Sequence, residues 1–445
     1  MASKQIPSVD GLPLLGRTFD FWGDTFAFYD ECHRTGGLVS CSLLGEPYLV
    51  ATDPAVVKGV LMDHADKFRQ GQLVRDTVGQ VTERGVFVVS GEQWKTQRMR
   101  LQPAFTPRRI QRHVDSMVEI TEREADALAT QTGQVVDSRE FTKQLTLHIL
   151  ARSLFGVEID SERTATIAEH VPGILNKFDM DSYQFFVPEW IPTAKNRAYR
   201  QSLSTLNDLI DELIAERKGR TDIEKVDILS TLLDPDKGER PSDAVIRDEL
   251  LTFAIAGHDT TANALTAAIH LLGHHPEWQA QVREEARTLF EDGEPSFFEL
   301  AEMDVTDQVI KETLRLYPPA PHLSRECIEN VDIEGYTIRE GANVLMPQYV
   351  IHRDGQYFDR PEEFHPERWT DGFEESLPEF AYYPFGGGPR NCIGMRFAMT
   401  ELRVALATLL RQFSFESLSD PELDNRIAIT LQPDEPVRVR VSPAE

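Results

Sequence analysis

Apolar residues recur three or four positions apart over most of the chain, which is the period of a helix. The longest such run covers residues 241–273, and another, Met395–Gln412, directly follows a glycine-rich loop. Further helical runs continue to about residue 232, interrupted by an aromatic-rich connector between about Phe178 and Pro192. The pattern therefore predicts a mainly α protein of the α+β class.

Short β-prone runs accompany the helices. Leu38–Thr52 is predicted to be a hairpin whose turn is Gly45-Glu46-Pro47, and the end of the chain, Arg426–Val441, is also β-prone. Residues 69–90 show no regular period. Because long loops inside compact domains are usually functional, this stretch is interpreted as a lid over a pocket. Small sheets beside many helices are expected.

Length and composition limit the possible classes. The 445 residues contain no linker or repeat and are 41% hydrophobic, so a single domain over residues 1–445 with no fused reductase is expected. The four cysteines form no Cys-x-x-Cys pair, which suits a reducing interior. With neither a signal-peptide core nor ~18 consecutive apolar residues, the sequence predicts a soluble, cytoplasmic protein with no membrane span.

The chain is strongly acidic, since 73 Asp and Glu residues against 46 Lys and Arg give a formal net charge of −27. This balance argues against nucleic acid as a partner. Only 11 of the basic residues are lysines. Excess carboxylates with few lysines favour a halophilic protein kept soluble in concentrated salt, with an ordinary acidic cytosolic protein as the alternative.

The glycine-rich loop carries the most specific chemistry. Residues 384–394 place Cys392 just before a helix, where unsatisfied N–H groups and the helix dipole favour a thiolate. A phosphate-binding loop is excluded, because neither the Gly-x-x-x-x-Gly-Lys-Ser/Thr nor the Gly-x-Gly-x-x-Gly spacing occurs there. The alternative for any single cysteine is a small buried apolar residue.

The whole pattern, Phe385-x-x-Gly388-x-Arg390-x-Cys392-x-Gly394, resembles the haem-binding signature of the cytochromes P-450. The resemblance implies the cytochrome P-450 fold, and haem b as the cofactor with Cys392 as its thiolate ligand. It also implies that Phe385 and Gly394 contact the haem and that Arg390 binds a haem propionate.

A second resemblance lies in the centre of the run 241–273. Ala256-Gly257-x-Asp259-Thr260 is similar to the family motif on the helix that faces the iron. In the family the two small residues leave space for O₂, the threonine hydrogen-bonds the reacting oxygen and the acid relays protons. The haem is therefore expected between this helix and the Cys392 loop. Without the resemblance, the threonines could simply bond back to the carbonyl four residues earlier.

Two further stretches match the family's propionate-binding residues. Gly91-x-x-Trp94-x-x-x-Arg98 resembles one such segment, although many bacterial members carry His at the position of Trp94, which leaves the subfamily open. Arg325 matches another propionate-binding arginine. Donors of this kind are what a buried carboxylate needs.

Glu312-x-x-Arg315, followed later by Arg368, resembles the buried structural clamp of the family. In that clamp one carboxylate lies between two guanidinium groups, so removal of any member leaves a buried charge unpaired. By itself a Glu-Arg pair at this spacing is an ordinary surface contact. The resemblance gives these three residues a structural role.

The resemblance also implies a substrate pocket. The implied lining residues are apolar and come from several segments, namely Phe87, Phe185, Phe253, Leu323 and Leu431. Any one of them could instead pack in the core. Such a lining favours an apolar, lipid- or terpenoid-like substrate.

No acidic residue occurs between Gln93 and Val114, whereas basic residues accumulate from Lys95 to Arg112. Such runs are most often solvated faces. In the family this region lies on the side of the haem where electron donors dock. The hypothesis is that it receives an acidic ferredoxin- or flavodoxin-type partner.

Together these resemblances imply a monooxygenase that inserts one oxygen atom of O₂ into an apolar molecule, with electrons from a separate donor. Two other classes stay open. A haem-thiolate isomerase, dehydratase or peroxygenase would share the cysteine loop but usually alters the acid-threonine pair. A haem sensor or electron carrier would need neither that pair nor an apolar pocket.

Overall fold

The computed structural model describes residues 4–158, 161–178, 187, 190–218, 227–234, 239–291, 293–370, 372–427 and 429–444. The chain forms two compact units, each assembled from separate segments. The sheet unit comprises Met1–Glu83, Phe87–Trp94 and Leu314–Cys392, and the helical unit comprises Arg84–Val86, Lys95–Thr313 and Ile393–Glu445. The chain passes repeatedly between the units, and the single domain expected over residues 1–445 stays a prediction.

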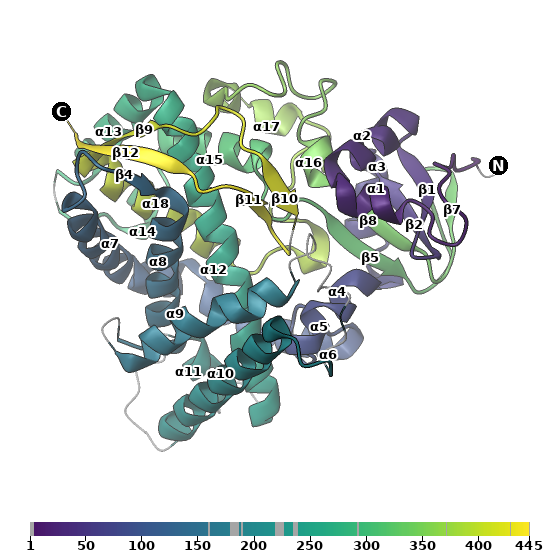
Figure 1. Ribbon diagram of the computed structural model, residues 1–445, viewed down its shortest axis with the longest axis horizontal. Helices are drawn as coiled ribbons and strands as arrows, with labels where there is room; N and C mark the ends of the chain where they lie inside the picture. The colour runs from purple at the N-terminus through teal and green to yellow at the C-terminus, as the bar shows by residue number, and fades with distance from the viewer. Residues whose placement is uncertain are drawn as a thin grey trace. The chain divides into compact units, whose positions relative to one another are not determined.

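A five-stranded mixed sheet is the centre of the sheet unit (Figure 1). In sheet order its strands are β1 (Leu38–Leu43), β2 (Glu46–Ala51), β8 (Asn343–Met346), β5 (Leu323–Cys327) and β3 (Phe68–Gln70). β8 pairs with β2 in parallel and is buried along its whole length, as a strand covered on both faces should be. Apolar side chains from these strands and from the helical residues 54–61 join in one core cluster.

The remaining elements of the sheet unit are short. They are α1 (Thr18–Gly23), α2 (Thr25–Thr35), α3 (Pro54–Lys58), α4 (Gln72–Asp76), α5 (Val78–Val81), β6 (Val331–Ile333), β7 (Tyr336–Ile338), α16 (Gln348–Ile351) and α17 (Phe373–Ser376). α2 and α3 begin after Asp24 and Asp53, whose carboxylates accept a backbone N–H of the first turn.

β1 and β2 form the predicted hairpin, but of the three predicted turn residues only Gly45 lies in the turn. The turn consists of Leu44 and Gly45, whose positive φ values of 53° and 83° are what a two-residue hairpin turn requires. Pro47 already lies in β2, opposite Ser42, and precedes the part of β2 that pairs with β8. Its missing N–H therefore interrupts no bond on that side.

The irregular segment expected over residues 69–90 is also partly wrong, because α4 and α5 lie within it. Helices of four or five residues are too short to show a period and depend on tertiary contacts. Here Gln72 donates its N–H to Asn343 Oδ1 (2.9 Å), and Arg75 pairs with Glu326. The interpretation of this stretch as a lid stays a prediction.

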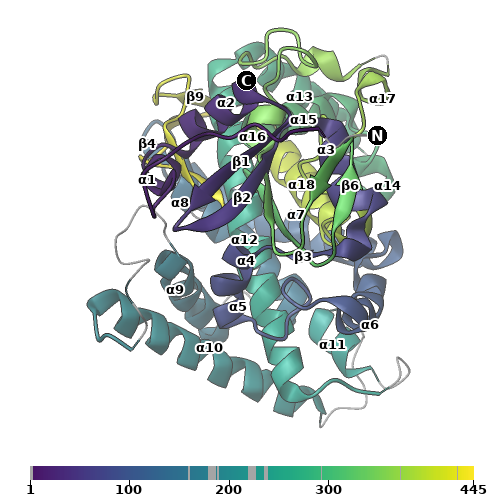
Figure 2. The same cartoon turned by 90° about the vertical axis from the view of Figure 1, so that its right-hand side faces the viewer.

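The helical unit is built around α12 (Asp243–His274), which confirms the run predicted over residues 241–273. Its other helices are α7 (Pro107–Ala129), α8 (Ser138–Leu150), α9 (Glu162–Leu175), α10 (Ala194–Lys218), α11 (Ile228–Leu233), α13 (Pro276–Leu289), α14 (Phe297–Leu300) and α18 (Met395–Gln412). α8 packs along α12 and α18 along α7 (Figure 1), and α9 lies beside α10 (Figure 2). α18 has the predicted bounds.

Two small sheets complete the helical unit. One has the order β4 (Val135–Asp137), β12 (Arg438–Pro443) and β9 (Phe413–Ser417), and the other pairs β10 (Asn425–Ile427) with β11 (Leu431–Pro433). Two helices, α6 (Gly91–Leu101) and α15 (Asp304–Leu316), contribute residues to both units. The mainly helical class with small sheets is confirmed. Among the described helices, none combines the length and the apolar character that a membrane crossing requires.

His270 makes the helical unit sensitive to acid. Its Nε2 lies 3.1 Å from Pro421 O, so this nitrogen carries the proton, and Nδ1 lies 2.9 Å from Ser417 Oγ. Burial lowers the pKa of His270 to about 4. Between the unfolded value of about 6.5 and this value only the unfolded state takes up the proton, so stability falls as the pH drops through that window.

We expect His270→Gln to remove part of this acid sensitivity. In the wild type, protonation of this histidine in the unfolded state should lower the unfolding free energy by about 2–3 kcal/mol when the pH falls from 7 to 4.5. The variant should be less stable than the wild type at pH 7 but lose less on acidification, measured by urea unfolding at both pH values. Equal acid losses in the two proteins would contradict the prediction.

Candidate functional site

The loop that ends at Cys392 is a closely hydrogen-bonded turn of the sheet unit. Asn391 donates its N–H to Gly388 O (3.2 Å), and Cys392 donates its N–H to Phe385 O (2.9 Å). These bonds fold residues 385–392 back on themselves and fix the backbone of the cysteine. Phe385 and Gly394, the two expected haem contacts beside it, are half-buried.

The glycines of this loop are required by packing inside the sheet unit. A Cβ on Gly388, where φ is 64°, would lie 1.9 Å from Leu61 O. A Cβ on Gly387 would lie 2.2 Å from the Phe380 ring. Because neither backbone nor a packed ring can yield that far, both positions exclude side chains.

The thiols divide clearly by exposure. Cys32, Cys41 and Cys327 are buried, and burial raises the pKa of Cys32 and of Cys41 to about 12. Cys392 is the exposed one. Among the described residues no three His, Cys, Asp or Glu side chains gather as they would around a metal ion. Cys392 could therefore serve as a single protein ligand to a metal ion whose other ligands belong to a cofactor.

Arg325 provides a buried positive charge in the sheet unit. Only 7% of the residue is exposed, and its Nη1 donates to Gln70 Oε1 (2.6 Å) and Ser324 O (2.9 Å), which are both neutral. Burial and the nearby Arg390 lower the pKa of Arg325 to about 9. Among the described residues no carboxylate pairs with it. A buried guanidinium in this situation fits an anionic ligand such as a haem propionate.

Arg390 contacts Trp94, and the two resemblances gave both residues as propionate-binding. Its guanidinium carbon lies 4.7 Å from the centre of the Trp94 ring, and its Nη2 donates to Val89 O (2.7 Å) and Ser90 Oγ (3.3 Å). This arrangement orients the planar group. Arg98, further along α6, belongs to the helical unit and is half-buried.

On α12 the expected oxygen-handling residues share one face. Ala256 is exposed and Gly257 and Thr260 are half-buried, although their neighbours in the helix are buried. A Cβ on Gly257 would lie 3.0 Å from Leu150 Cδ1 of α8, so the glycine also serves packing between the two helices. The face is therefore open enough for a ligand to approach the small residues.

The threonines of α12 bond back along the helix. Thr260 donates its hydroxyl to Ala256 O (2.6 Å) and Thr261 donates to Gly257 O (3.1 Å). This is the structural alternative raised from the sequence, and it holds the Thr260 oxygen in place with its lone pairs still able to accept. The two roles are compatible.

Asp259 is buried and hydrogen-bonded to residues near the C-terminus. Its Oδ2 accepts from Gln432 Nε2 (2.9 Å), Asn263 Nδ2 (3.2 Å) and the hydroxyl of Thr430. Gln432 in turn accepts from Arg139 Nη2 (2.7 Å). Three donors on one carboxylate oxygen fix its orientation, while the other oxygen makes none of these bonds.

Sequence reasoning missed these anchors of Asp259. The sequence indicated only a β-prone run over residues 426–441 with Leu431 as a pocket residue, and Asn263 and Arg139 carried no motif. Asn263 lies four residues after Asp259 on the same helix, so helical spacing offered that contact. Nothing local links Gln432 to a helix 173 residues earlier.

The three residues of the predicted clamp are buried, and their pairing with one another stays a prediction. Glu312 and Arg315 are both completely buried, and Arg368 is 9% exposed. The two arginines bind backbone carbonyls of residues 352–363, with Arg315 donating to His352 O (2.9 Å) and Arg368 donating to Asp359 O (2.8 Å). They thus fasten one segment of the sheet unit, which supports a structural role.

The five expected pocket residues lie in different environments. Phe87 is 42% exposed, Leu323 is half-buried, and Leu431 in β11 is buried. Phe253 is 7% exposed and packs on Phe105, with ring centres 5.4 Å apart. Phe185 lies outside the described residues. Phe87 and Leu323 are thus the more accessible members of the set.

The basic stretch Lys95–Arg112 is not uniformly a surface. Arg100 is buried and its guanidinium binds the carbonyls of Leu232 and Glu239. Lys95, Arg108 and Arg112 are exposed. The charge available to a partner is therefore smaller than the sequence indicated.

Comparison with known proteins gives matches along nearly the whole chain. A family model described as Cytochrome P450 matches residues 6–440. Cytochrome P450 3A31 of Mesocricetus auratus is 28% identical, with 99% of this chain and 91% of the relative covered. Cytochrome P450 3A6 of Oryctolagus cuniculus is 29% identical, with 98% and 91% covered. The crystal structure of the cytochrome P450DA heme domain matches with a TM-score of 0.86 and 26% identity, covering 100% of this chain and 99% of that chain.

Proposed function

Because the chain belongs to the cytochrome P450 family, we propose that it inserts one oxygen atom of O₂ into an apolar, lipid- or terpenoid-like molecule with electrons from a separate donor. Membership confirms the expected fold, the haem-thiolate cofactor and the monooxygenase class. The observation that carries the residue assignment is the exposed Cys392 at the end of the hydrogen-bonded loop.

Residues of the sheet unit would hold the cofactor. Cys392 would ligate the iron, since its thiol is exposed where the others are buried. Arg325 and Arg390 would pair with the propionates, and Trp94 would orient Arg390 by stacking. When bound, thiolate-ligated haem supplies the iron at which O₂ is reduced and an oxygen atom is transferred.

Residues of α12 would manage space and protons. Ala256 and Gly257 leave room on the open face of the helix, and the Thr260 oxygen is held there by its bond to Ala256 O. Asp259 would supply protons, and Gln432 and Thr430 hold its carboxylate in a fixed orientation. Since these bonds leave one carboxylate oxygen available, a water molecule could bridge from it.

The substrate class rests on the exposed apolar side chains. Phe87 is 42% exposed although it is a large aromatic residue, and Leu323 is half-buried in β5. An apolar molecule that covers them would gain roughly 25 cal/mol for each Å² of apolar surface removed from water. Addition of such molecules to the holoenzyme should shift the spin state of the iron.

We expect Thr260→Val to separate electron consumption from product formation. The variant keeps the shape of threonine but loses the hydroxyl beside the open face of α12. Product per electron pair should fall roughly tenfold or more, with hydrogen peroxide released in its place. The measurement is the ratio of product and peroxide to reduced nicotinamide consumed, with an apolar substrate chosen by its spin shift.

Thr261→Val is the matched control, because Thr261 bonds back to Gly257 O but is buried. It should keep the wild-type ratio of product to peroxide. Equal losses in the two variants would mean that the threonines act only on the helix, and the oxygen-handling role of Thr260 would then be wrong.

The exposed arginines of α7 are the candidate docking surface for the electron donor. Arg108 and Arg112 lie one helical turn apart, in a stretch without acidic residues. The rest of this chain is strongly acidic. A locally basic face therefore favours binding of an acidic ferredoxin- or flavodoxin-type protein at this place.

The double variant Arg108→Glu and Arg112→Glu should slow reduction by an acidic donor about tenfold or more at low salt, because opposite charges steer association. Haem content should not change. Arg200→Glu, which reverses an exposed arginine of α10 that has no ion-pair partner among the described residues, is the control. Stopped-flow reduction rates that are equal in all three proteins would remove this docking face.

A further inference from the structure

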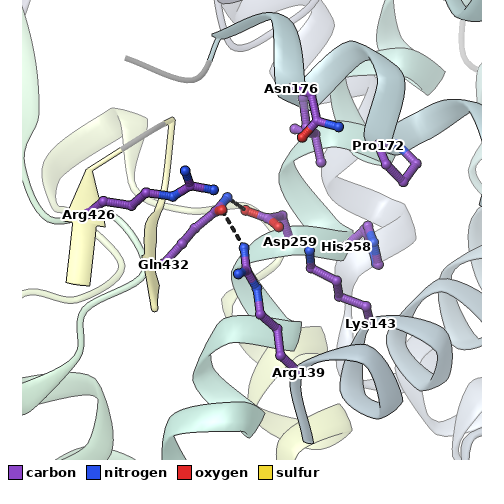
Figure 3. A pocket seen from close by; sticks show the side chains of 9 residues that line it. Arg139, Lys143, Pro172, Asn176, His258, Asp259, Arg426 and Gln432 are labelled. Carbon is purple, nitrogen blue, oxygen red and sulfur yellow. Dashed lines mark hydrogen bonds between the residues drawn. The ribbon is translucent and has the colours of Figure 1, made fainter. Parts of the chain in front are cut away.

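A small cavity lies next to Asp259 in the helical unit (Figure 3). Its volume is about 40 Å³, which is room for roughly three water molecules. Most of the polar side chains that line it come from α8, α12, β10 and β11, and Asn176 comes from the turn after α9. The ones used below are Arg139, Lys143, His258, Asp259, Arg426 and Gln432. We call it the Asp259 cavity.

Positive charge predominates in the lining. Three of the described lining residues are Arg or Lys, whereas Asp259 is the one carboxylate among them. Arg426 has its own acidic neighbour, since its Nε lies 3.6 Å from Asp434 Oδ1. Burial lowers the pKa of His258 to about 4, so its ring is neutral at pH 7. Arg139 and Lys143 thus face a single carboxylate.

Arg139 and Lys143 make no ion pair with any described residue. Arg139 donates to Gln432 Oε1 (2.7 Å) and Pro433 O (3.1 Å), which are neutral, and its Nε is buried without a partner. Lys143 Nζ has neither a hydrogen bond nor a carboxylate within 4.0 Å in the described structure. Even a partly buried cation without an anionic partner is costly, because part of its hydration is lost.

The charges around Lys143 also leave its positive charge uncompensated. Burial and the neighbouring Arg139 lower the pKa of its ammonium group, while Asp259, Glu140 and Asp137 act against this from a distance. The net effect is a lowered pKa of Lys143, so the carboxylates present do not compensate for its burial. Lys143 is half-buried, so solvent reaches part of its side chain.

From this geometry we propose that the Asp259 cavity binds a small inorganic monoanion such as chloride, held by Lys143 and Arg139. The anion supplies the negative charge that these two side chains lack, and the cavity is large enough for a single-atom ion. Both cations belong to α8, and Arg139 also donates directly to Gln432 of β11, so the anion would lie beside this contact between the helix and the strand. The carboxylate of Asp259 would keep its bonds to Gln432, Asn263 and Thr430, none of which the anion replaces.

The test compares thermal unfolding of the holoenzyme in sodium chloride and in sodium gluconate at one fixed ionic strength. Gluconate is a six-carbon polyol carboxylate and is far larger than the single-atom ion proposed for this site. We expect the wild type to unfold about 2–4 °C higher in chloride, since a ligand of the folded state raises the unfolding temperature. In Lys143→Met, which keeps the apolar stem and removes the charge, this difference should vanish.

Lys218→Met is the matched control for a general loss of positive charge. Lys218 forms an exposed ion pair with Asp243 on another part of the same unit, so this variant should keep the chloride difference. A chloride difference that persists in Lys143→Met, or that is absent from the wild type, would overturn the proposal. Haem content, recorded for every protein, shows whether a variant is folded.

A bromide soak of holoenzyme crystals gives a direct answer that does not depend on stability. An anomalous peak next to Lys143 Nζ would support the site, and bromide peaks confined to other surfaces would overturn it. Neither experiment measures turnover, so the outcome is distinguishable from that of the proposed oxygenase reaction.

Discussion

Cys392→Ala is expected to abolish the strongly red-shifted Soret band that dithionite-reduced wild type should show with carbon monoxide. The band requires a thiolate ligand, and alanine leaves the iron without one. Oxygenation of substrate should fall to background, since donation from the thiolate promotes cleavage of the O–O bond. The measurement is the reduced difference spectrum with and without carbon monoxide, together with haem content.

Cys41→Ala is the matched control for this prediction. Cys41 lies in β1 of the same unit, but it is buried and burial raises the pKa of its thiol to about 12. The control should keep the red-shifted band, with a modest loss of stability from the missing sulfur. A red-shifted band that survives in Cys392→Ala would contradict the assignment of Cys392 as the haem ligand. A variant that binds no haem at all would agree with the assignment.

Local chemistry explains why the cysteine loop and α18 could be predicted. The glycines, the two prolines and the cysteine lie within eleven consecutive residues, and the helical period of residues 395–412 begins directly after them. The bounds of α18 agree at both ends, because Gly394 precedes the helix and β9 begins at Phe413. Signals of this kind need no knowledge of distant residues.

The orientation of Asp259 could not be predicted, because it depends on contacts between distant parts of the chain. The motif marks the acid, yet Thr430 and Gln432 determine where its carboxylate points. In the same way the basic stretch gave no sign that Arg100 is buried against two carbonyls. A charge run shows which residues are cationic but does not show which of them water reaches.

The short helices α4 and α5 illustrate a third limit. Each has at most five residues, less than the window over which a helical period can be recognised. Their stability comes from contacts such as that of Gln72 with Asn343, 271 residues later. Elements of this length follow from the fold around them, whereas α12 and α18 follow from their own sequence.

The largest expected loss of stability concerns Arg315. Its side chain is completely buried, and its guanidinium binds the carbonyls of His352 (2.9 Å), Pro361 (2.5 Å) and Glu363 (3.1 Å). The group also lies 5.2 Å from the centre of the Phe358 ring. Arg315→Leu would leave three carbonyls without these bonds in a region that excludes water. We expect a loss of about 3–5 kcal/mol of unfolding free energy.

Arg360→Leu is the control within the same segment of the sheet unit. Arg360 is 47% exposed and pairs with Asp359 and Glu363 at the surface, so its removal should cost at most about 1 kcal/mol. Urea unfolding of the holoenzyme measures both variants. Similar small losses in the two would mean that Arg315 does not fasten the segment.

Arg315→Lys distinguishes the geometry of the guanidinium from its charge. Lysine keeps the positive charge, but a single ammonium cannot reproduce the planar fork that serves three separated carbonyls. We therefore expect a loss between those of Arg315→Leu and the wild type, with haem content reduced in proportion to the folded fraction. If lysine restored full stability, charge alone would be the requirement. Should Arg315→Leu fail to accumulate, the lysine variant still provides the measurement, because a wild-type midpoint would contradict the role of the fork.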